Sequence, residues 1–266
     1  QRVEAERARK QARNSSSPLT AVRNLIFDSC REAGALPQGF FSLTVPTGGG
    51  KTLSAMAFAL AHAKERCLRR VIVVIPYLSI IEQNAAEYRS ILDPDNREIV
   101  VEHHSSVTVA DRKDDEQPTL AELAAENWEA PVIVTTSVQF IESLFACSPS
   151  KCRKLHNIAK SVIILDEVQT LPTHLLEPLM SVLHELKENY GVTFVFSTAT
   201  QPAFKYSQFL KEGFKADEVT EITRDTSAAF TALQRVEYQR AGPWDWKTLA
   251  QKLAAEPQAL CIALSK

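Results

Sequence analysis

The chain has 266 residues, enough to bury a sizeable core in one large domain or two small ones. Hydrophobic residues make up 45% and charged residues 23%, the balance of an ordinary soluble globular protein. The longest apolar runs are too short to cross a bilayer and no signal peptide precedes them, so we expect a cytoplasmic protein with no membrane partner. The formal net charge of −2 excludes a globally basic nucleic-acid coat but not a local basic groove.

The N-terminal segment is polar and strongly charged. Its first fourteen residues carry five Lys or Arg and two Glu, a pattern typical of a solvated helix or a linker. Asn14–Pro18 interrupts this segment, and we expect residues 1–18 to be a linker or helix from a missing N-terminal domain. From Leu19 to Ala35 apolar residues recur at helical spacing, and Phe41–Val45 is a short strand candidate.

A glycine-rich loop follows this strand candidate and precedes a helix expected from Thr52 to about Arg66. Glycines let backbone N–H groups turn inward toward a phosphate, a lysine reaches the β- and γ-phosphates, and a threonine hydroxyl binds magnesium. The strict G-x-x-x-x-G-K-T pattern fails at Val45, whereas the shorter P-T-G-x-G-K-T form fits completely. The alternative is a purely structural turn. We predict that ATP and Mg²⁺ bind here, through Thr47, Gly48, Gly49, Gly50, Lys51 and Thr52.

Short apolar runs and amphipathic segments then alternate along the chain. This alternation predicts a doubly wound α/β domain, in which a parallel sheet lies between two layers of helices. The expected strands are Val71–Ile75, Val132–Thr135, Val162–Leu165 and Val192–Phe196, and the expected helices are Leu78–Ile91, Val138–Phe145 and a segment within Leu175–Tyr190.

The C-terminal part gives weaker signals. Ala229–Arg240 reads as a strand pair or one long strand, and Asp245–Ala255 reads as a helix. We therefore expect one α/β domain over residues 19–240, followed by a connector and the start of another domain over 241–266. Charged residues at Asp111–Gln117 predict a surface loop.

Two carboxylates stand at the end of a predicted strand. Val162–Leu165 runs directly into Asp166 and Glu167, which places both acids at the carboxyl edge of the sheet, beside the glycine-rich loop. Asp166 would hold Mg²⁺ and Glu167 would orient and deprotonate the attacking water. Two solvated acids at a strand end are the alternative. Together with the loop, the pair predicts ATP hydrolysis, with Lys51, Asp166 and Glu167 as the catalytic residues.

The loop, the Asp-Glu-x-x box and a Ser-Thr-Ala-Thr element about 30 residues later are similar to superfamily 2 helicases. The resemblance implies a RecA-like P-loop NTPase lobe that moves along nucleic acid. In that family the serine–threonine element couples the nucleotide state to the grip on the strand. On this resemblance the coupling residues are Gln169, Ser197, Thr198 and Thr200, although the serine and threonines can equally be a helix cap.

Several longer stretches resemble one family, the CRISPR-associated helicase–nuclease of type I systems, and within it the type I-C branch. The resemblance is dense from Phe41 to Phe204. Its stretches are Ile75–Asn84, Glu102–Ser105, Glu126–Phe140, Lys151–Pro172 and Ser197–Phe204.

The same resemblance implies residues that contact nucleic acid at the ends of strands. Hydroxyls, amides and backbone N–H groups there can bind phosphates without reading bases, as a translocating motor requires. A strand-to-helix turn with a packed aromatic is the alternative for Pro76–Tyr77, and a helix N-cap is the alternative for Thr135–Thr136. The implied contacts are Pro76, Tyr77, Gln83, Thr135, Thr136 and Gln139.

The family resemblance implies an ATP-dependent translocase or helicase lobe. Its expected partners are single-stranded DNA, an RNA-guided CRISPR surveillance complex and, for an isolated lobe, an inhibitor protein. An RNA or repair helicase lobe, and a nucleotide-binding interaction module without turnover, are the alternatives.

Parts of the family's machinery have no counterpart in this sequence. The family's nuclease uses a His-Asp dipeptide, which is absent. The second motor lobe and its arginine finger are also missing, so we expect a fragment with little activity alone. The start at Gln1 and the apolar end at Leu260–Lys266 agree with this expectation. Gln38 is our candidate for adenine recognition.

Other groups of potential metal ligands give no site. Cys147 and Cys152 are the most closely spaced of five scattered cysteines and lack a second pair, so we expect reduced thiols rather than zinc. His103 and His104 are adjacent and would point to opposite faces of a strand, which favours a solvated or hydrogen-bonded pair. Lys151–Lys154 and His156 form a small basic cluster that either contacts DNA or is a solvated face.

Overall fold

The computed structural model of the chain describes residues 1–13, 18–104, 127–199, 204–208, 210–224, 226–234, 236 and 242–262. The chain divides into two compact units, Gln1–Leu233 and Gln234–Lys266. Within the described residues, no helix is both long and apolar enough to cross a membrane. The charged surface loop predicted at Asp111–Gln117 lies outside the described residues.

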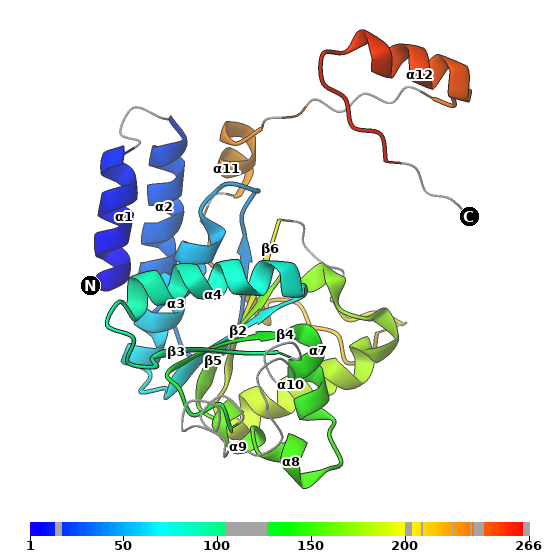
Figure 1. Ribbon diagram of the computed structural model, residues 1–266. Coiled ribbons are helices and arrows are strands. Elements are labelled where there is room, and N and C mark those ends of the chain that lie inside the picture. The colour runs from blue at the N-terminus through cyan, green and yellow to red at the C-terminus, as the bar shows by residue number, and fades with distance from the viewer. Residues whose placement is uncertain are drawn as a thin grey trace, which may run out of the picture. The chain divides into compact units, whose positions relative to one another are not determined.

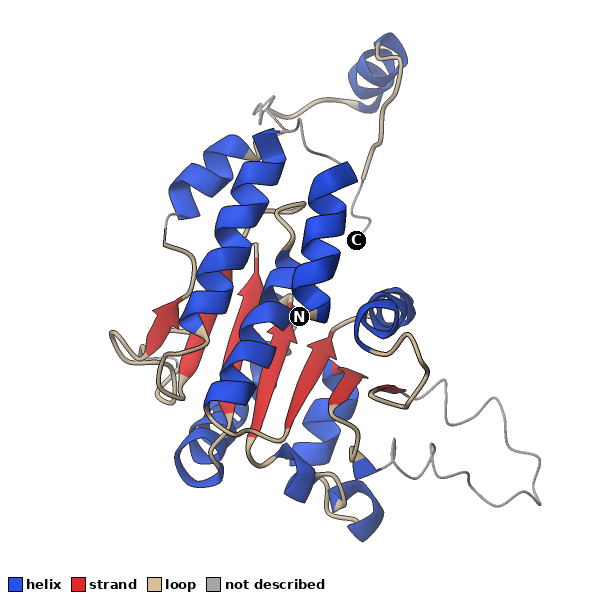
Figure 2. Cartoon of the chain, turned by 90° about the vertical axis from the view of Figure 1, so that its left-hand side faces the viewer, coloured by secondary structure: helices blue, strands red, loops and turns tan. Residues whose placement is uncertain are grey.

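A seven-stranded parallel sheet forms the centre of the first unit (Figures 1 and 2). The strand order is β3-β4-β2-β5-β6-β1-β7, and every neighbouring pair is parallel. The predicted doubly wound α/β fold is therefore confirmed. The strands are β1 (Phe40–Thr44), β2 (Arg70–Ile75), β3 (Val100–His103), β4 (Val132–Thr136), β5 (Ser161–Asp166), β6 (Thr193–Thr198) and β7 (Val219–Glu221).

Helices cover both faces of the sheet. Residues of β2 alternate between two cores: Val73 packs in the first, and Ile72 and Val74 in the second. Because both faces are covered, the central strands are apolar throughout rather than alternating with polar residues. The first core includes helices α2 (Pro18–Ala33), α3 (Lys51–Glu65) and α4 (Leu78–Leu92); the second includes α7 (Ser137–Leu144), α9 (Leu155–Ile158) and α10 (Leu176–Tyr190). The short helices α8 (Pro149–Cys152), η1 (Val168–Thr170) and η2 (Thr173–Leu175) lie in connections.

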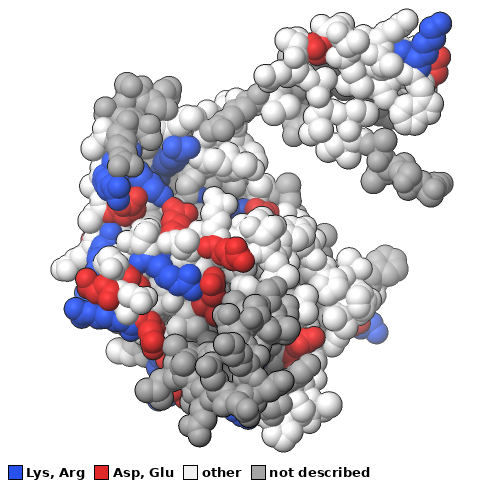
Figure 3. Space-filling model, viewed as in Figure 1, with Lys and Arg blue, Asp and Glu red and all other residues white. Residues whose placement is uncertain are grey.

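The charged N-terminal segment forms helix α1 (Arg2–Arg13), which lies beside α2 (Figure 1). Val3 is buried, and Arg7 makes two hydrogen bonds of 2.5 and 2.8 Å to the carboxylate of Asp28 on α2. Lys10 pairs with Glu87 of α4 at 2.6 Å. Basic and acidic side chains therefore lie intermixed over these helices (Figure 3). The helix packs within the first unit, and the domain boundary at residue 18 stays a prediction.

The strand prediction for Ala229–Arg240 is wrong in its described part. Thr226–Ala232 forms helix α11, and Ala229 and Leu233, four residues apart, are both buried. That spacing places them on one helix face, and burying this face outweighs the aromatic and β-branched residues that suggested a strand. Residues 235 and 237–241 lie outside the described part of the chain. In the second unit the predicted helix is confirmed as α12 (Trp246–Ala255), capped by Asp245, which accepts a 2.8 Å hydrogen bond from Thr248 N.

The histidine pair is buried, so the solvated alternative is wrong. His103 ends β3 and is 7% exposed, and His104 is 2% exposed. Desolvation, together with the charge of Lys154 and the neighbouring His104, lowers the pKa of His103 to about 4. Lys154 is itself buried against the ring of Trp128, which also excludes it from the solvated face predicted for the basic cluster. Among the described residues, no three His, Cys, Asp or Glu gather in a metal-binding group.

Burial of His103 predicts a loss of stability in mild acid. In the unfolded chain the imidazole takes up a proton near pH 6.5, whereas the folded chain excludes it down to about pH 4. The stabilisation is therefore complete above pH 6.5 and is lost as the pH falls toward 4, by up to roughly 3 kcal/mol. Denaturant unfolding at pH 7 and pH 4.5 measures it. We expect His103→Gln to reduce the change in unfolding free energy between the two pH values, and His156→Gln, at an exposed position, to leave it unchanged. The same change in wild type and both variants would show that His103 is not the group responsible.

Candidate functional site

The glycine-rich loop connects β1 to α3, at the carboxyl edge of the sheet. Gly48 and Gly50 have φ angles of 85° and 80°, in the left-handed region that residues with a Cβ rarely adopt. A Cβ on Gly49 would collide with the side chain of Val45 and the main-chain oxygen of Pro46. Each glycine is thus required by the backbone, and the loop delivers Lys51 and Thr52 to the first turn of α3.

The predicted acids meet the loop lysine. Asp166 ends β5 and Glu167 follows it, with a left-handed φ of 45°. The Nζ of Lys51 donates a hydrogen bond to Glu167 Oε1 and lies 3.5 Å from Asp166 Oδ1. The structure therefore brings together three residues predicted to be catalytic, 116 residues apart in the chain at the widest separation.

Glu167 is held in its charged form. Burial raises the pKa of this carboxyl, but hydrogen bonds from Lys51 and Gln169 and the charge of Lys51 outweigh it, so the pKa lies below its ordinary value. An ionised carboxylate at neutral pH is what a general base requires. In this conformation, however, both Glu167 oxygens accept hydrogen bonds from Lys51 and Gln169.

Polar contacts connect the acids to the end of β6. Ser197 Oγ donates to Asp166 Oδ1 at 2.9 Å. Gln169 Nε2 donates to Glu167 Oε2 at 2.7 Å, while its Oε1 accepts from Thr198 Oγ1 at 2.8 Å. Three of the four predicted coupling residues therefore lie in one network with the acid pair. The fourth, Thr200, lies outside the described residues.

This network predicts an uncoupling substitution. In the full-length protein, Gln169→Ala removes the bridge between Glu167 and Thr198 while leaving the loop and both acids in place. We expect ATP affinity to stay near the wild-type value and stimulation of ATP hydrolysis by nucleic acid to fall about tenfold, because one or two hydrogen bonds of about 1 kcal/mol each are lost. Steady-state hydrolysis with and without nucleic acid measures this ratio. Unchanged stimulation would show that the bridge carries no signal.

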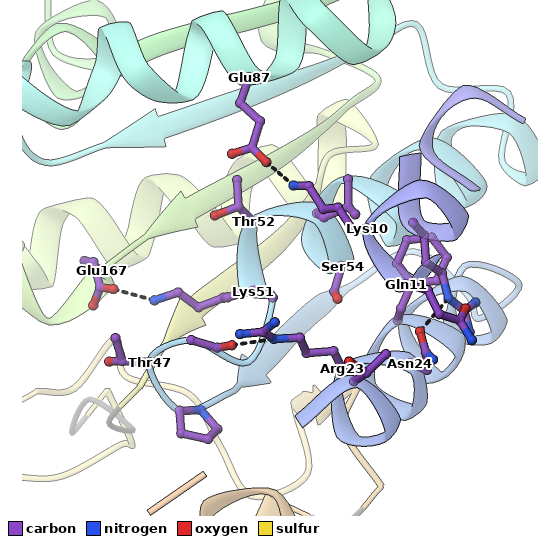
Figure 4. Close-up of a pocket in the computed structure, with 17 residues that line it drawn as sticks. Lys10, Gln11, Arg23, Asn24, Thr47, Lys51, Thr52, Ser54, Glu87 and Glu167 are labelled. Carbon is purple, nitrogen blue, oxygen red and sulfur yellow. Dashed lines mark hydrogen bonds and ion pairs between the residues drawn. The ribbon is translucent and has the colours of Figure 1, made fainter. Parts of the chain in front are cut away.

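A cavity of 420 Å³ opens beside the loop (Figure 4). One wall is the loop with the start of α3, and Glu167 also lines the cavity. The sequence did not predict the other wall, which α1 and α2 contribute, because no motif marks it. Its residues are Arg7, Lys10, Gln11, Thr20, Arg23, Asn24 and Phe27.

Gln38 lies elsewhere, so its predicted role in adenine recognition is wrong. Its Nε2 donates a 2.7 Å hydrogen bond to the main-chain oxygen of Gly191, just before β6. Both residues precede their strands, and hence lie at the amino edge of the parallel sheet, opposite the loop.

The first group of predicted nucleic-acid contacts is accessible. Tyr77 is 52% exposed at the start of α4, Gln83 is exposed, and Pro76 is half-buried at the end of β2. The packed-aromatic alternative does not hold for Tyr77. Their contact with nucleic acid stays a prediction.

The second group divides into residues with different surroundings. Thr135 is fully buried, and its hydroxyl donates a 2.7 Å hydrogen bond to the main-chain oxygen of His103. Thr136 caps α7, since its Oγ1 accepts a 3.1 Å hydrogen bond from Gln139 N. The N-cap alternative thus describes Thr136, and the hydroxyl of Thr135 does not reach the surface in this conformation. Gln139, half-buried in the first turn of α7, remains a predicted contact.

The parallel sheet, the glycine-rich phosphate loop (residues 47–52) and the acid pair define the nucleotide-binding lobe of a P-loop NTPase. Residues 19–209 match the family model described as DEAD/DEAH box helicase, and the chain belongs to this family. It is 30% identical over 178 residues to the CRISPR-associated nuclease/helicase Cas3 of Haloferax volcanii, which covers 60% of this chain and 19% of that protein. The expected similarity to superfamily 2 helicases and to the CRISPR-associated helicase–nuclease is thereby confirmed.

Solved structures show the same fold. The crystal structure of T. fusca Cas3 with ATP superposes with a TM-score of 0.56 at 17% identity and covers 82% of this chain and 23% of its own. T. fusca Cas3 with AMPPNP gives 0.55 at 19% identity and covers 66% and 20%. The chain thus spans about a fifth of the length of the relatives it matches.

Proposed function

We propose that this chain is the first motor lobe of an ATP-dependent helicase that moves along single-stranded DNA in type I CRISPR interference. The observation that carries the proposal is the connected set of contacts from Lys51 through Glu167 and Gln169 to Thr198. A motor needs such a connection, because the state of the nucleotide has to reach the residues that hold the strand.

The chemistry of the site suits ATP. Backbone N–H groups of the loop and the start of α3 favour phosphate, and Lys51 adds a positive charge. Glu167 would then take the proton of the attacking water once Lys51 has turned to the phosphates. Thr52 and Asp166 offer the hydroxyl and carboxylate oxygens that Mg²⁺ prefers, and Asp166 Oδ2 has no hydrogen-bond partner among the described residues. Bound Mg²⁺ would neutralise charge on the phosphates.

The substrate and partners rest on the similarity to Cas3, which is a nuclease/helicase by name. We infer a cytoplasmic protein that acts on DNA opened by an RNA-guided surveillance complex. The strand would cross the carboxyl edge near Pro76, Tyr77, Gln83 and Gln139. An inhibitor protein is a further candidate partner for this lobe.

ATP hydrolysis by the full-length protein tests the proposal. We expect single-stranded DNA to stimulate turnover strongly and single-stranded RNA of the same sequence to have little effect. Stronger stimulation by RNA would favour an RNA helicase. Binding of ATP with turnover that ignores both nucleic acids would favour the interaction module, against which the ionised Glu167 argues.

A further inference from the structure

The cavity beside the phosphate loop collects four positively charged side chains, and three of them are paired with acids. Arg7 is held by Asp28, Lys10 by Glu87 and Lys51 by Glu167. The fourth is Arg23, in the second turn of α2. Among the described residues no acidic side chain pairs with it, and its Nε donates a hydrogen bond to a main-chain oxygen.

Arg23 reaches across from α2 to the loop itself (Figure 4). Its Nε donates a 2.8 Å hydrogen bond to Gly48 O, and its aliphatic stem passes close to Gly50. The guanidinium keeps the N–H donors of Nη1 and Nη2, which make no hydrogen bond to any residue that the structure describes. Arg23 and Lys51 line the same cavity, so an anion cradled by the loop would lie within the field of both charges.

A guanidinium without a counter-ion beside a phosphate cradle has a chemical consequence. Its planar fork of N–H donors matches phosphate oxygens, and hydrogen bonds between two charged groups are about twice as strong as neutral ones. A main-chain carbonyl satisfies one donor but neutralises no charge.

We propose that Arg23 is a second phosphate-binding cation of the nucleotide site, supplied by the helix upstream of the loop. The inference rests on the proposed function, because it assumes that the loop binds ATP. Arg23 would use the four N–H donors of Nη1 and Nη2, or release Gly48 O, to bind the phosphate chain. The competing explanation is that Arg23 only holds the loop in shape through Gly48.

Nucleotide binding to this chain separates the two explanations. We would titrate wild type, R23A, R23K and R23Q with ATP, ADP and adenosine in the presence of Mg²⁺, and measure each melting temperature without nucleotide. Lysine keeps the charge, whereas glutamine keeps a neutral donor for Gly48 O. R31A, on the same helix but exposed and away from the cavity, is the matched control, and K51A identifies binding at the loop.

We expect R23A and R23Q to weaken ATP binding by about 10-fold or more, R23K to weaken it less, and adenosine binding to change in none of them. R31A should bind ATP as wild type does. Wild-type affinity in R23A, or full rescue by glutamine but not by lysine, would overturn the inference while leaving the proposed function in place. If wild type binds no ATP, or binds it no better than K51A does, both the inference and the proposed function are wrong. Should R23A fold poorly, the ATP affinities of R23K and R23Q still decide between the two explanations, because a phosphate-binding role requires R23K to bind more tightly.

Discussion

Replacing Glu167 with Gln is expected to stop ATP hydrolysis by the full-length protein while ATP still binds. The amide is isosteric and can accept the hydrogen bond from Lys51, so the loop and β5 keep their positions. It cannot take a proton from water, and loss of a general base lowers turnover about 100- to 10,000-fold. Single-turnover hydrolysis and ATP titration of the same preparation measure the two quantities.

Glu185→Gln is the control for this substitution. Glu185 is exposed on α10, remote from the loop. We expect the Glu185→Gln variant to hydrolyse ATP at the wild-type rate. If Glu167→Gln also hydrolyses ATP at the wild-type rate, the carboxylate is not the general base, and its hydrogen bond to Lys51 has only a structural role.

Lys51→Ala is expected to weaken ATP binding by about 100-fold or more. The substitution removes the cation that faces both the phosphate loop and the acid pair, and loss of one partner of a buried charge contact costs about 2–5 kcal/mol. It also leaves Asp166 and Glu167 as neighbouring negative charges without a cation, which repels the phosphates further. Equilibrium titration of this chain with ATP and Mg²⁺ gives the affinity.

Lys64→Ala on the same helix provides the comparison. Lys64 is exposed in the last turn of α3, so its removal tests the general loss of one positive charge. Near-equal affinities of the two variants would mean that the loop does not bind the nucleotide through Lys51.

The centre of the fold could be predicted from local sequence, and the edges of the sheet could not. β2 and β5 are continuous apolar runs, because helices cover both of their faces. The edge strands β3 and β7 have only four and three residues, and each contains a glutamate. Their strand conformation comes from pairing with β4 and β1, which a local pattern does not contain.

The same limit explains why Thr135 and Thr136 could not be told apart. Both follow the apolar part of β4, and both hydroxyls suited a phosphate contact. Pairing with β3 encloses Thr135 and gives its hydroxyl a partner in His103, whereas Thr136 lies at the point where α7 begins. The burial of Thr135 therefore depends on a strand that the sequence did not predict, whereas Thr136 serves as the N-cap of a helix that it did.

The phosphate loop and the acid pair were predictable because each is encoded in consecutive residues. The loop's glycines are required by its own backbone, and the acids follow directly from the end of a strand. The opposite wall of the cavity depends on how α1 and α2 pack, through contacts such as that between Arg7 and Asp28. No spacing in the sequence predicts such a contact, and so the sequence indicates only that Arg23 belongs to a helix.

In the structure, the carboxylate of Glu167 already occupies Lys51 and therefore competes with phosphate for it. An incoming phosphate chain does not meet a bare cation; it has to displace a carboxylate that is already bound. We therefore expect the affinity for a polyphosphate to reflect this exchange and to be weaker than the intrinsic attraction of the loop for phosphate. A ligand without phosphates would leave the internal pair intact and gain nothing from Lys51, whereas a bound polyphosphate would free Glu167 in the same step.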